Sequence, residues 1–114
     1  MKILIIDENM ILSSKLRNQA KDKGYEPKIL SFVRQDSYEK IKGFNPDYIL
    51  INLESKANSS LELIDKLKKD NFKIIGYCGH TRIDLAQKAK DKGANFIATN
   101  SSIISHFEEI IKGV

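Results

Sequence analysis

Five polar or reactive side chains stand at or just after the ends of short apolar runs, where a strand would pass into a loop: Asp7, Glu8, Asn52, Cys78 and Asn100. Adjacent carboxylates and the oxygens near them are ligands that Mg²⁺ accepts in proteins. A thiolate can attack an electrophile or bind a metal, whereas an amide only donates and accepts hydrogen bonds. Which chemistry is available therefore depends on which of these groups the fold brings together.

The apolar runs themselves are too short for helices and are rich in β-branched residues, which predicts buried strands. They cover residues 3–6, 28–33, 48–53, 73–77 and 95–99. Helical apolar stripes follow the runs. The first stripe ends at Gly24 and the fourth at Gly93, as C-terminal glycines favour. A short second helix is expected around residues 37–42.

Serines stand before two of the helical stripes and predict N-caps. Ser59 or Ser60 would cap the third helix, whose apolar positions are Leu61, Ile64 and Leu67. Ser101 or Ser102 would cap one last helix with the apolar positions Ile103, Ile104, Phe107, Ile110 and Ile111.

This regular alternation predicts a single α/β domain over residues 1–114. We expect a three-layer, flavodoxin-like (βα)5 fold: a five-stranded parallel sheet of order 2-1-3-4-5 with helices on both faces. Ligands gather beyond the carboxyl ends of the strands in such sheets, so the five polar residues should lie at one edge.

Composition narrows the functional classes. Hydrophobic residues make up 41% and charged residues 30% of the chain, with a net charge of +4. The basic residues alternate with acidic ones and lack interleaved aromatics, which argues against nucleic-acid binding. One cysteine excludes a disulfide framework, no run is long enough to span a membrane, and the start of the chain does not read as a signal peptide. The expected location is the cytoplasm.

Four segments resemble the receiver domains of two-component response regulators. They are KILIIDEN, GYEPKIL, NPDYILINLES and KGANFIATNS, in the order and spacing of that family. The resemblance implies that a histidine kinase would transfer a phosphoryl group to an aspartate ending the third strand. It also implies a magnesium ion held by the acidic pair, a Thr or Ser ending strand four, a Lys-Pro ending strand five and an aromatic residue within strand five.

Five positions depart from that pattern. Asn52 replaces the aspartate, Cys78 the Thr or Ser, Ile97 the aromatic residue, Asn100 the lysine and Ser101 the proline. Phe96 precedes the aromatic position by one residue and would point to the other face of the strand. Because a non-proline cis peptide costs about 2.5–4 kcal/mol, we expect a trans bond between Asn100 and Ser101.

The departures disable the same chemistry. An acyl phosphate needs a carboxylate nucleophile, which the Asn52 amide does not supply, and the loss of a lysine at Asn100 removes a stabilising cation. Natural degeneracy explains them better than a single engineered change. We expect Asn52 to hydrogen-bond its local backbone and Cys78 to act as a small buried hydrophobe.

The acidic pair has two interpretations. Asp7 and Glu8 either retain a weak magnesium site, with no other cofactor implied, or pair with Lys56, His80 or Arg82 in place of the missing lysine. A zinc site of Cys78 and His80 with the acids is a further alternative, but its spacing matches no standard site.

The leading hypothesis is a pseudo-receiver: a non-enzymatic, phosphorylation-independent module that binds a protein partner. The expected surface is the face of helix four, strand five and helix five, about residues 83–112, which could also form a homodimer. The alternatives are phosphorylation at an unusual residue such as Glu54 or Ser55, a pocket reused for a small ligand or ion, and nucleic-acid binding.

Overall fold

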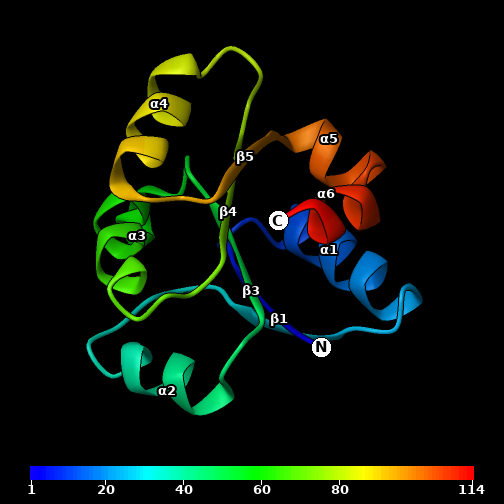
Figure 1. The fold of residues 1–114 in the computed structure, drawn as a ribbon, viewed down its shortest axis with the longest axis horizontal. Helices are drawn as coiled ribbons and strands as arrows, with labels where there is room; N and C mark the ends of the chain where they lie inside the picture. The colour runs from blue at the N-terminus through cyan, green and yellow to red at the C-terminus, as the bar shows by residue number, and fades with distance from the viewer.

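Five parallel strands form one sheet in the order β2-β1-β3-β4-β5 (Figure 1), as predicted. The computed structural model describes residues 1–114. The strands are β1 (Lys2–Ile6), β2 (Glu26–Leu30), β3 (Tyr48–Asn52), β4 (Ile74–Cys78) and β5 (Phe96–Thr99). Every residue of β3 and β4 is buried, as expected for strands covered on both faces.

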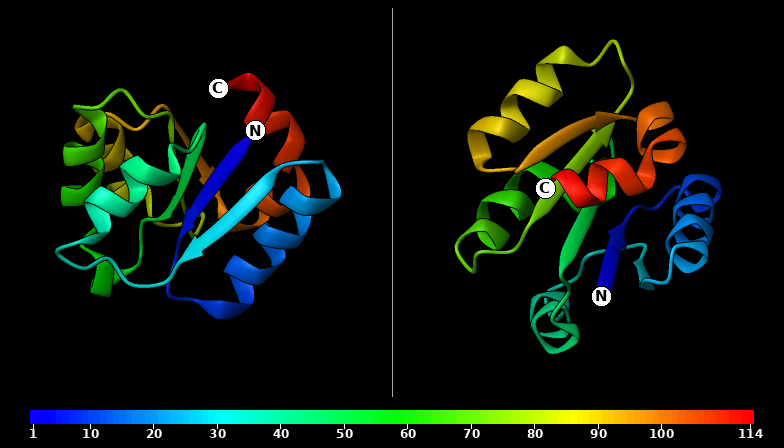
Figure 2. Two further views of the ribbon diagram at one scale, coloured as in Figure 1. Left: turned by 90° about the horizontal axis from the view of Figure 1, so that it is seen from below. Right: turned by 45° about the vertical axis from the view of Figure 1, so that its right-hand side comes forward.

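Helices cover both faces of this sheet. They are α1 (Met10–Asp22), α2 (Ser37–Phe44), α3 (Ser60–Lys68), α4 (Ile83–Lys92), α5 (Asn100–Ser105) and α6 (Phe107–Gly113), with a 3-10 turn η1 (Lys56–Asn58) before α3. Figures 1 and 2 show α2, α3 and α4 on one side and α1, α5 and α6 on the other. No helix is long and apolar enough to cross a membrane.

Alternation along the strands divides the core into two clusters. Leu4, Ile49 and Ile74 pack on the side of α2, α3 and α4. Ile5 and Leu50 pack on the side of α1, α5 and α6. The same alternation continues at the carboxyl ends of β1, β3 and β4, so each polar residue there lies on one face of the sheet or the other.

Two predicted helix ends are confirmed. Gly24, just after α1, has φ +86°, and Gly93, just after α4, has φ +111°. A side chain is strained in this left-handed region, so glycine is the residue that ends these helices at little cost. The predicted trans bond between Asn100 and Ser101 is also confirmed, because the chain contains no cis peptide bond.

The second strand is displaced from its prediction. It runs over Glu26–Leu30 instead of residues 28–33. Pro27 is accommodated because β2 is an edge strand that pairs only with β1. Residues 31–33 leave the sheet because Asn58 holds them: its Nδ2 donates to the Ser31 carbonyl at 2.9 Å, and its Oδ1 accepts from the Val33 amide at 2.7 Å.

Serine caps were predicted for two helices. Ser59 occupies the N-cap position of α3, as predicted, but it has φ +45° and makes no side-chain capping bond, and Ser60 donates its hydroxyl to the Asn52 carbonyl at 2.7 Å. The prediction of Ser101 or Ser102 as the cap of the last helix is wrong. At the start of α5 the cap is Thr99, whose Oγ1 accepts from the Ser102 amide at 3.1 Å. Thr99 ends a strand with extended backbone, which is the conformation an N-cap requires.

The single last helix of the prediction is divided into α5 and α6. His106, with φ −123° and ψ +35°, separates them. Gln19 of α1 donates to the Ile104 carbonyl at 2.9 Å beside this break. The predicted apolar stripe survives the break, since Ile103, Phe107 and Ile111 are all buried against the sheet.

Candidate functional site

Asp7, Asn52 and Tyr77 meet at the carboxyl edge of the three central strands. Asn52 pairs with Tyr77 across β3 and β4, and Asp7 follows β1 directly. Two-residue alternation places all three on the sheet face covered by α1 and α5. Adjacent strands are about 4.8 Å apart, so side chains at these positions can reach one another.

Asp7 is completely buried and accepts three hydrogen bonds from neutral groups. Its Oδ1 accepts from Asn52 Nδ2 at 3.0 Å and from the Asn9 amide at 2.8 Å. Its Oδ2 accepts from the Tyr77 hydroxyl at 2.8 Å. A buried carboxylate is costly unless it is paired or hydrogen-bonded, and these three donors meet that requirement.

Asn52 fits between Asp7 and the following loop in one orientation. Its Nδ2 donates to the Asp7 carboxylate, and its Oδ1 accepts from the Glu54 amide at 2.9 Å. A carboxylate at this position would accept the Glu54 bond but would have no proton to donate to Asp7. The predicted bond between Asn52 and its local backbone is confirmed, with a second role in satisfying Asp7.

Tyr77 is the functional residue that sequence reasoning missed. Burial raises the pKa of its hydroxyl well above the ordinary value of 10.0, and the negative charge of Asp7 and the hydrogen bond to it act in the same direction. The phenol is therefore held neutral and donates. In the sequence, Tyr77 is one more apolar residue of a buried strand, and only the pairing of β3 with β4 places its hydroxyl beside Asp7.

The Glu8 carboxylate bonds to groups outside the Asp7 network. Its Oε1 accepts from the Ser55 hydroxyl at 2.8 Å, and Asn58 Nδ2 donates to the same hydroxyl at 3.0 Å. Ser55 is buried, with 4% of its surface exposed. The pair fastens the loop after β3 to the loop after β1.

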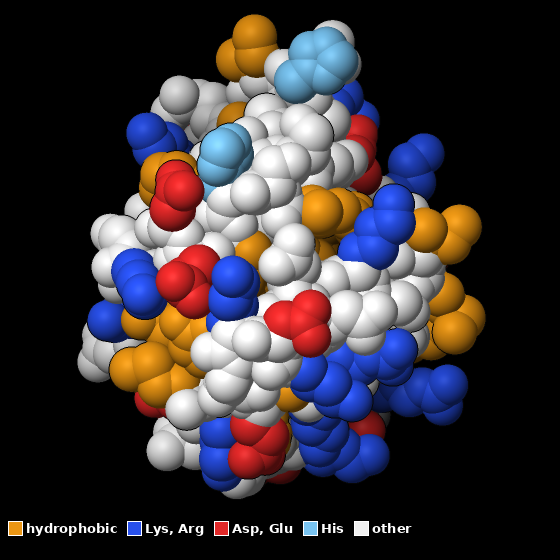
Figure 3. All heavy atoms as spheres, turned by 90° about the vertical axis from the view of Figure 1, so that its right-hand side faces the viewer, with side chains coloured by type: hydrophobic (Ala, Val, Ile, Leu, Met, Phe, Trp, Pro, Cys, Tyr) orange, Lys and Arg blue, Asp and Glu red, His pale blue; other side chains and the backbone are white.

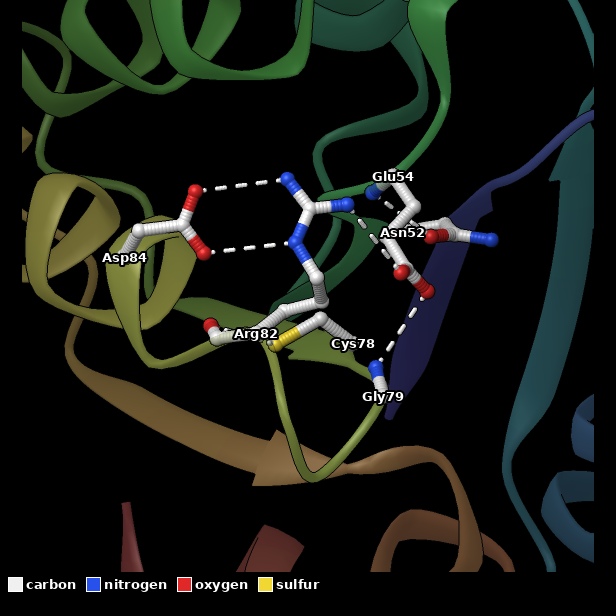
Figure 4. Close-up of polar contacts among 6 residues, drawn as sticks. All are labelled: Asn52, Glu54, Cys78, Gly79, Arg82 and Asp84. Atoms are coloured by element: carbon white, nitrogen blue, oxygen red, sulfur yellow. Dashed lines mark hydrogen bonds and ion pairs between the residues drawn. The ribbon is translucent and has the colours of Figure 1, made fainter.

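The predicted ion pairing of Asp7 or Glu8 with Lys56, His80 or Arg82 is wrong. Arg82 instead lies between Glu54 and Asp84 (Figure 4). Its Nη1 is 3.6 Å from Glu54 Oε1, and its Nε and Nη2 donate to the Asp84 carboxylate at 3.2 and 3.3 Å. The Arg82–Asp84 contact raises the pKa of the arginine and lowers that of the aspartate. Arg82 immediately precedes α4, so its side chain meets Asp84 in the first turn of that helix and Glu54 in the loop after β3.

No protein-family model matches the chain, and no curated protein matches it. Solved structures do match. The receiver domain of NtrX from Brucella abortus matches with a TM-score of 0.80 and 19% identity, over 98% of this chain and 99% of that one. A two-component response regulator from Clostridium difficile gives 0.87 and 18%, over 99% and 93%. The beryllofluoride-activated NtrC4 receiver domain dimer gives 0.73 and 25%, over 95% and 97%.

The chain has the receiver-domain fold. A match to a longer NtrX chain from Brucella abortus, with a TM-score of 0.85, covers 97% of this chain but only 25% of that one. The TM-scores of these matches establish the fold. Because the identities are only 18–25%, the chemistry of the carboxyl edge is argued from this chain's own residues.

Within the receiver fold, Cys78 lies on the opposite sheet face from Tyr77. Only 3% of its surface is exposed, and its thiol lies 3.8 Å from the Arg82 carbonyl, a weak hydrogen bond. Burial, and then the charge of Glu54, raises its pKa. The prediction that Cys78 acts as a small buried hydrophobe is confirmed.

The receiver positions on β5 and α5 are separate from the Asp7 network. Ile97 packs into the core under α3 and α4, whereas Phe96 is 42% exposed, so the predicted opposite orientation of these two residues is confirmed. Asn100 begins α5, and its buried Oδ1 has no hydrogen-bond partner. Ser101 is exposed, with its hydroxyl 3.4 Å from Thr99 Oγ1.

The edge offers little to a metal ion. No group of three or more His, Cys, Asp or Glu side chains lies close enough to hold one, which contradicts the zinc alternative. Both Asp7 oxygens already accept hydrogen bonds, and Asn52 turns its NH₂ group, not its oxygen, toward that carboxylate. The residues present do not fit a tight magnesium site, and a weak one at Asp7 and Glu8 stays a prediction.

A groove of about 430 Å³ lies between α4 and β5, beyond the carboxyl end of β4. Ile83 and Phe96 contribute apolar surface, with 76% and 42% exposed, and Arg82 and Lys90 contribute positive charge. Figure 3 shows the face that carries α1, α5 and α6, where hydrophobic side chains are interspersed with acidic and basic ones. The groove belongs to the face on which the predicted partner surface lies.

Proposed function

We propose that this chain is a receiver-type signalling domain of a two-component system that acts without phosphorylation, as a protein-interaction module and not as an enzyme. The observation that carries the proposal is the amide of Asn52, which donates to the buried Asp7 carboxylate at 3.0 Å. An amide in this place satisfies the acid without an ion and supplies no nucleophile for an acyl phosphate.

Similar structures give the contrast. A response regulator from Burkholderia pseudomallei, with a TM-score of 0.80 and 19% identity, was solved with a phosphorylated aspartic acid and a calcium ion. By the resemblance in sequence, Asn52 stands at the phosphoacceptor position of this chain. Both oxygens of the Asp7 carboxylate, the neighbouring group that would help to hold a cation, already accept hydrogen bonds, from Asn9 and Tyr77.

The alternative acceptors are poorly placed. The Ser55 hydroxyl is buried and engaged with Glu8 and Asn58. Glu54 uses both carboxylate oxygens, one toward the Gly79 amide at 3.2 Å and one toward Arg82. Positioned, in-line attack on a phosphodonor requires a free oxygen. Ser55 is buried and bonded, and the exposed Glu54 carboxylate is already engaged by the Gly79 amide and Arg82.

Intact-mass spectrometry after incubation with acetyl phosphate and Mg²⁺ tests the proposal. We expect no mass increase of the wild-type protein. The Asn52→Asp variant, which restores a carboxylate at this position, is treated in the same way as a control. A stoichiometric gain of one phosphoryl group by the wild-type protein would overturn the proposal, and peptide mapping would then identify the acceptor.

The partner surface of this proposal is the face of α4, β5 and α5, within residues 83–112. The exposed side chains of Ile83 and Phe96 support it, because both line the same groove and exposed apolar surface gathered at one place is typical of interaction sites. A second copy of the chain is one candidate partner, in line with the NtrC4 receiver domain dimer. Light scattering on wild type and Ile83→Ser tests this: a concentration-dependent dimer that the variant weakens is the expected result for self-association. A monomer at all concentrations leaves a different protein as the partner.

A further inference from the structure

Glu54 connects the Asn52 site to the groove between α4 and β5. Its backbone amide donates to Asn52 Oδ1 at 2.9 Å, and its carboxylate reaches across to the segment between β4 and α4 (Figure 4). There Oε2 accepts from the Gly79 amide at 3.2 Å, and Oε1 lies 3.6 Å from Arg82 Nη1. One acidic side chain from the loop after β3 thus contacts both ends of the four-residue segment Gly79–Arg82.

Apart from the contact of the Arg82 side chain with Asp84 in α4, the Gly79–Arg82 segment makes few other contacts that fix its position. Its own turn is closed by a bond of 3.0 Å from the Arg82 amide to the Gly79 carbonyl. The Arg82 carbonyl accepts the first bond of α4, from the Ala86 amide at 3.1 Å, and the weak contact of the Cys78 thiol. Arg82 precedes α4 without a side-chain cap, so the position of this helix start depends on contacts made by the segment.

The same segment forms one wall of the groove. Gly79, Arg82 and Ile83 all line it, and Ile83 is the first residue of α4. A shift of the segment would therefore move apolar and charged groups of the groove together. A segment fixed in one position would present the groove in one shape.

We infer that Glu54 is an anionic clasp: its carboxylate holds the Gly79–Arg82 segment and so favours one conformation of the start of α4 and of the α4–β5 groove. Glu54 acts as a positioning residue, through Gly79 and Arg82, on a surface that contacts the partner. This inference rests on the proposed function, because it supplies the means by which the docking face is held without phosphorylation.

The clasp is weak enough to be tested without unfolding the protein. Glu54 and Arg82 side chains are 35% and 43% exposed, and exposed ion pairs contribute little to global stability. Replacing the carboxylate should therefore change the local segment far more than the whole fold. The matched control is Glu26→Gln, since Glu26 is exposed on β2 and its side chain has no bonding partner.

Amide NMR with hydrogen exchange on full-length wild type, Glu54→Ala, Glu54→Gln and Arg82→Gln tests the clasp. In Glu54→Ala we expect protection of the Gly79 amide to fall about tenfold and the resonances of Ile83–Ala86 to move. Glu54→Gln keeps an oxygen for Gly79 but loses the charge facing Arg82, so it should fall between wild type and alanine. The double variant Glu54→Ala/Arg82→Gln should move the α4 resonances less than the sum of the two single variants, as coupled residues do.

The Glu26→Gln control should leave the α4 resonances and the protection of the Gly79 amide unchanged. If Glu54→Ala also leaves both unchanged, the clasp is overturned. Additive effects in the double variant would overturn the coupling through Arg82. Phosphorylation of wild type by acetyl phosphate contradicts the proposed function but leaves the clasp standing, because the exchange measurement needs no phosphodonor. The two failures are therefore distinguishable.

Discussion

The hydroxyl of Tyr77 donates a hydrogen bond of 2.8 Å to Oδ2 of Asp7. This bond joins β4 to the residue that follows β1, inside the protein, where both residues are fully buried. With the Asn52 amide on the other oxygen, it leaves Asp7 satisfied by neutral donors alone. The acidic edge of this receiver fold is thus closed by hydrogen bonds, and its stability should depend on them.

Removing the Tyr77 hydroxyl should destabilise the protein. Tyr77→Phe leaves Asp7 Oδ2 buried without its donor, and such a loss costs about 1–3 kcal/mol. Urea unfolding followed by circular dichroism measures it. Tyr48→Phe is the control, because the Tyr48 ring packs under the Lys73 ammonium at 5.5 Å while its hydroxyl bonds no protein group. Equal, small effects of the two variants would contradict the account.

Alkaline pH should weaken the fold through the same residue. Burial raises the pKa of Tyr77 well above its ordinary value of 10.0, so the folded protein keeps the phenol protonated after the unfolded chain has lost the proton. The contribution of Tyr77 to the free energy of unfolding should therefore be constant below about pH 9 and fall above about pH 10, by up to ~1.4 kcal/mol per pH unit. Urea unfolding from pH 8 to 11 should show the advantage of wild type over Tyr77→Phe narrowing. A constant difference between the two proteins would contradict the role of the buried phenol.

A carboxylate at position 52 should reopen the edge to a cation. Asn52→Asp replaces the donor 3.0 Å from Asp7 with a second negative charge, which should destabilise the protein by about 1–3 kcal/mol without divalent ions. If the variant binds Mg²⁺ with a Kd of about 1 mM, 10 mM Mg²⁺ restores ~1.4 kcal/mol.

Thermal or urea unfolding with and without Mg²⁺ measures this difference. Wild type should gain much less stability from Mg²⁺ than Asn52→Asp, since its Asp7 oxygens are occupied. Asn71→Asp, which adds the same charge at an exposed position, should likewise gain much less. Magnesium stabilisation of wild type equal to that of Asn52→Asp would show that the ion site survives.

The Cys78 thiol should be inert in the folded protein. Its surface is 3% exposed, and burial and the Glu54 charge raise its pKa, so little thiolate is present at neutral pH. Reaction with a thiol-specific disulfide reagent at pH 8 should be at least ~100-fold slower than in urea-unfolded protein. A folded-state rate near the unfolded one would place the thiol in an open, reactive site.

The fold could be predicted from the sequence because its signals are local. Short β-branched runs such as Tyr48–Asn52 and glycines such as Gly24 and Gly93 mark strands and helix ends without knowledge of their neighbours. Right-handed parallel crossovers then leave few topologies, and the flavodoxin-like order expected among them is the observed one. The role of Asn52 was accessible too, because its bond to Glu54 is only two residues away.

The rest of the site depends on contacts between distant segments. The Tyr77 hydroxyl reaches a residue 70 positions away, and in the sequence Tyr77 reads as ordinary core. Arg82 was expected to pair with Asp7 or Glu8. Its side chain instead contacts Asp84, two residues away in the sequence, and Glu54, which the fold brings beside it. The break at His106 likewise lies beside a carbonyl bonded by Gln19, which no pattern within the last helix reveals.

Closure of the carboxyl edge to phosphoryl chemistry is tested most directly by amide NMR during titration with Mg²⁺ and beryllofluoride, an analogue of a bound phosphoryl group. We expect no saturable shifts at Asp7, Asn52 or Asn100 in the wild-type protein. Saturable shifts confined to these residues and the start of α4 would contradict it, because they would show that the edge still binds the ion and the phosphoryl analogue together.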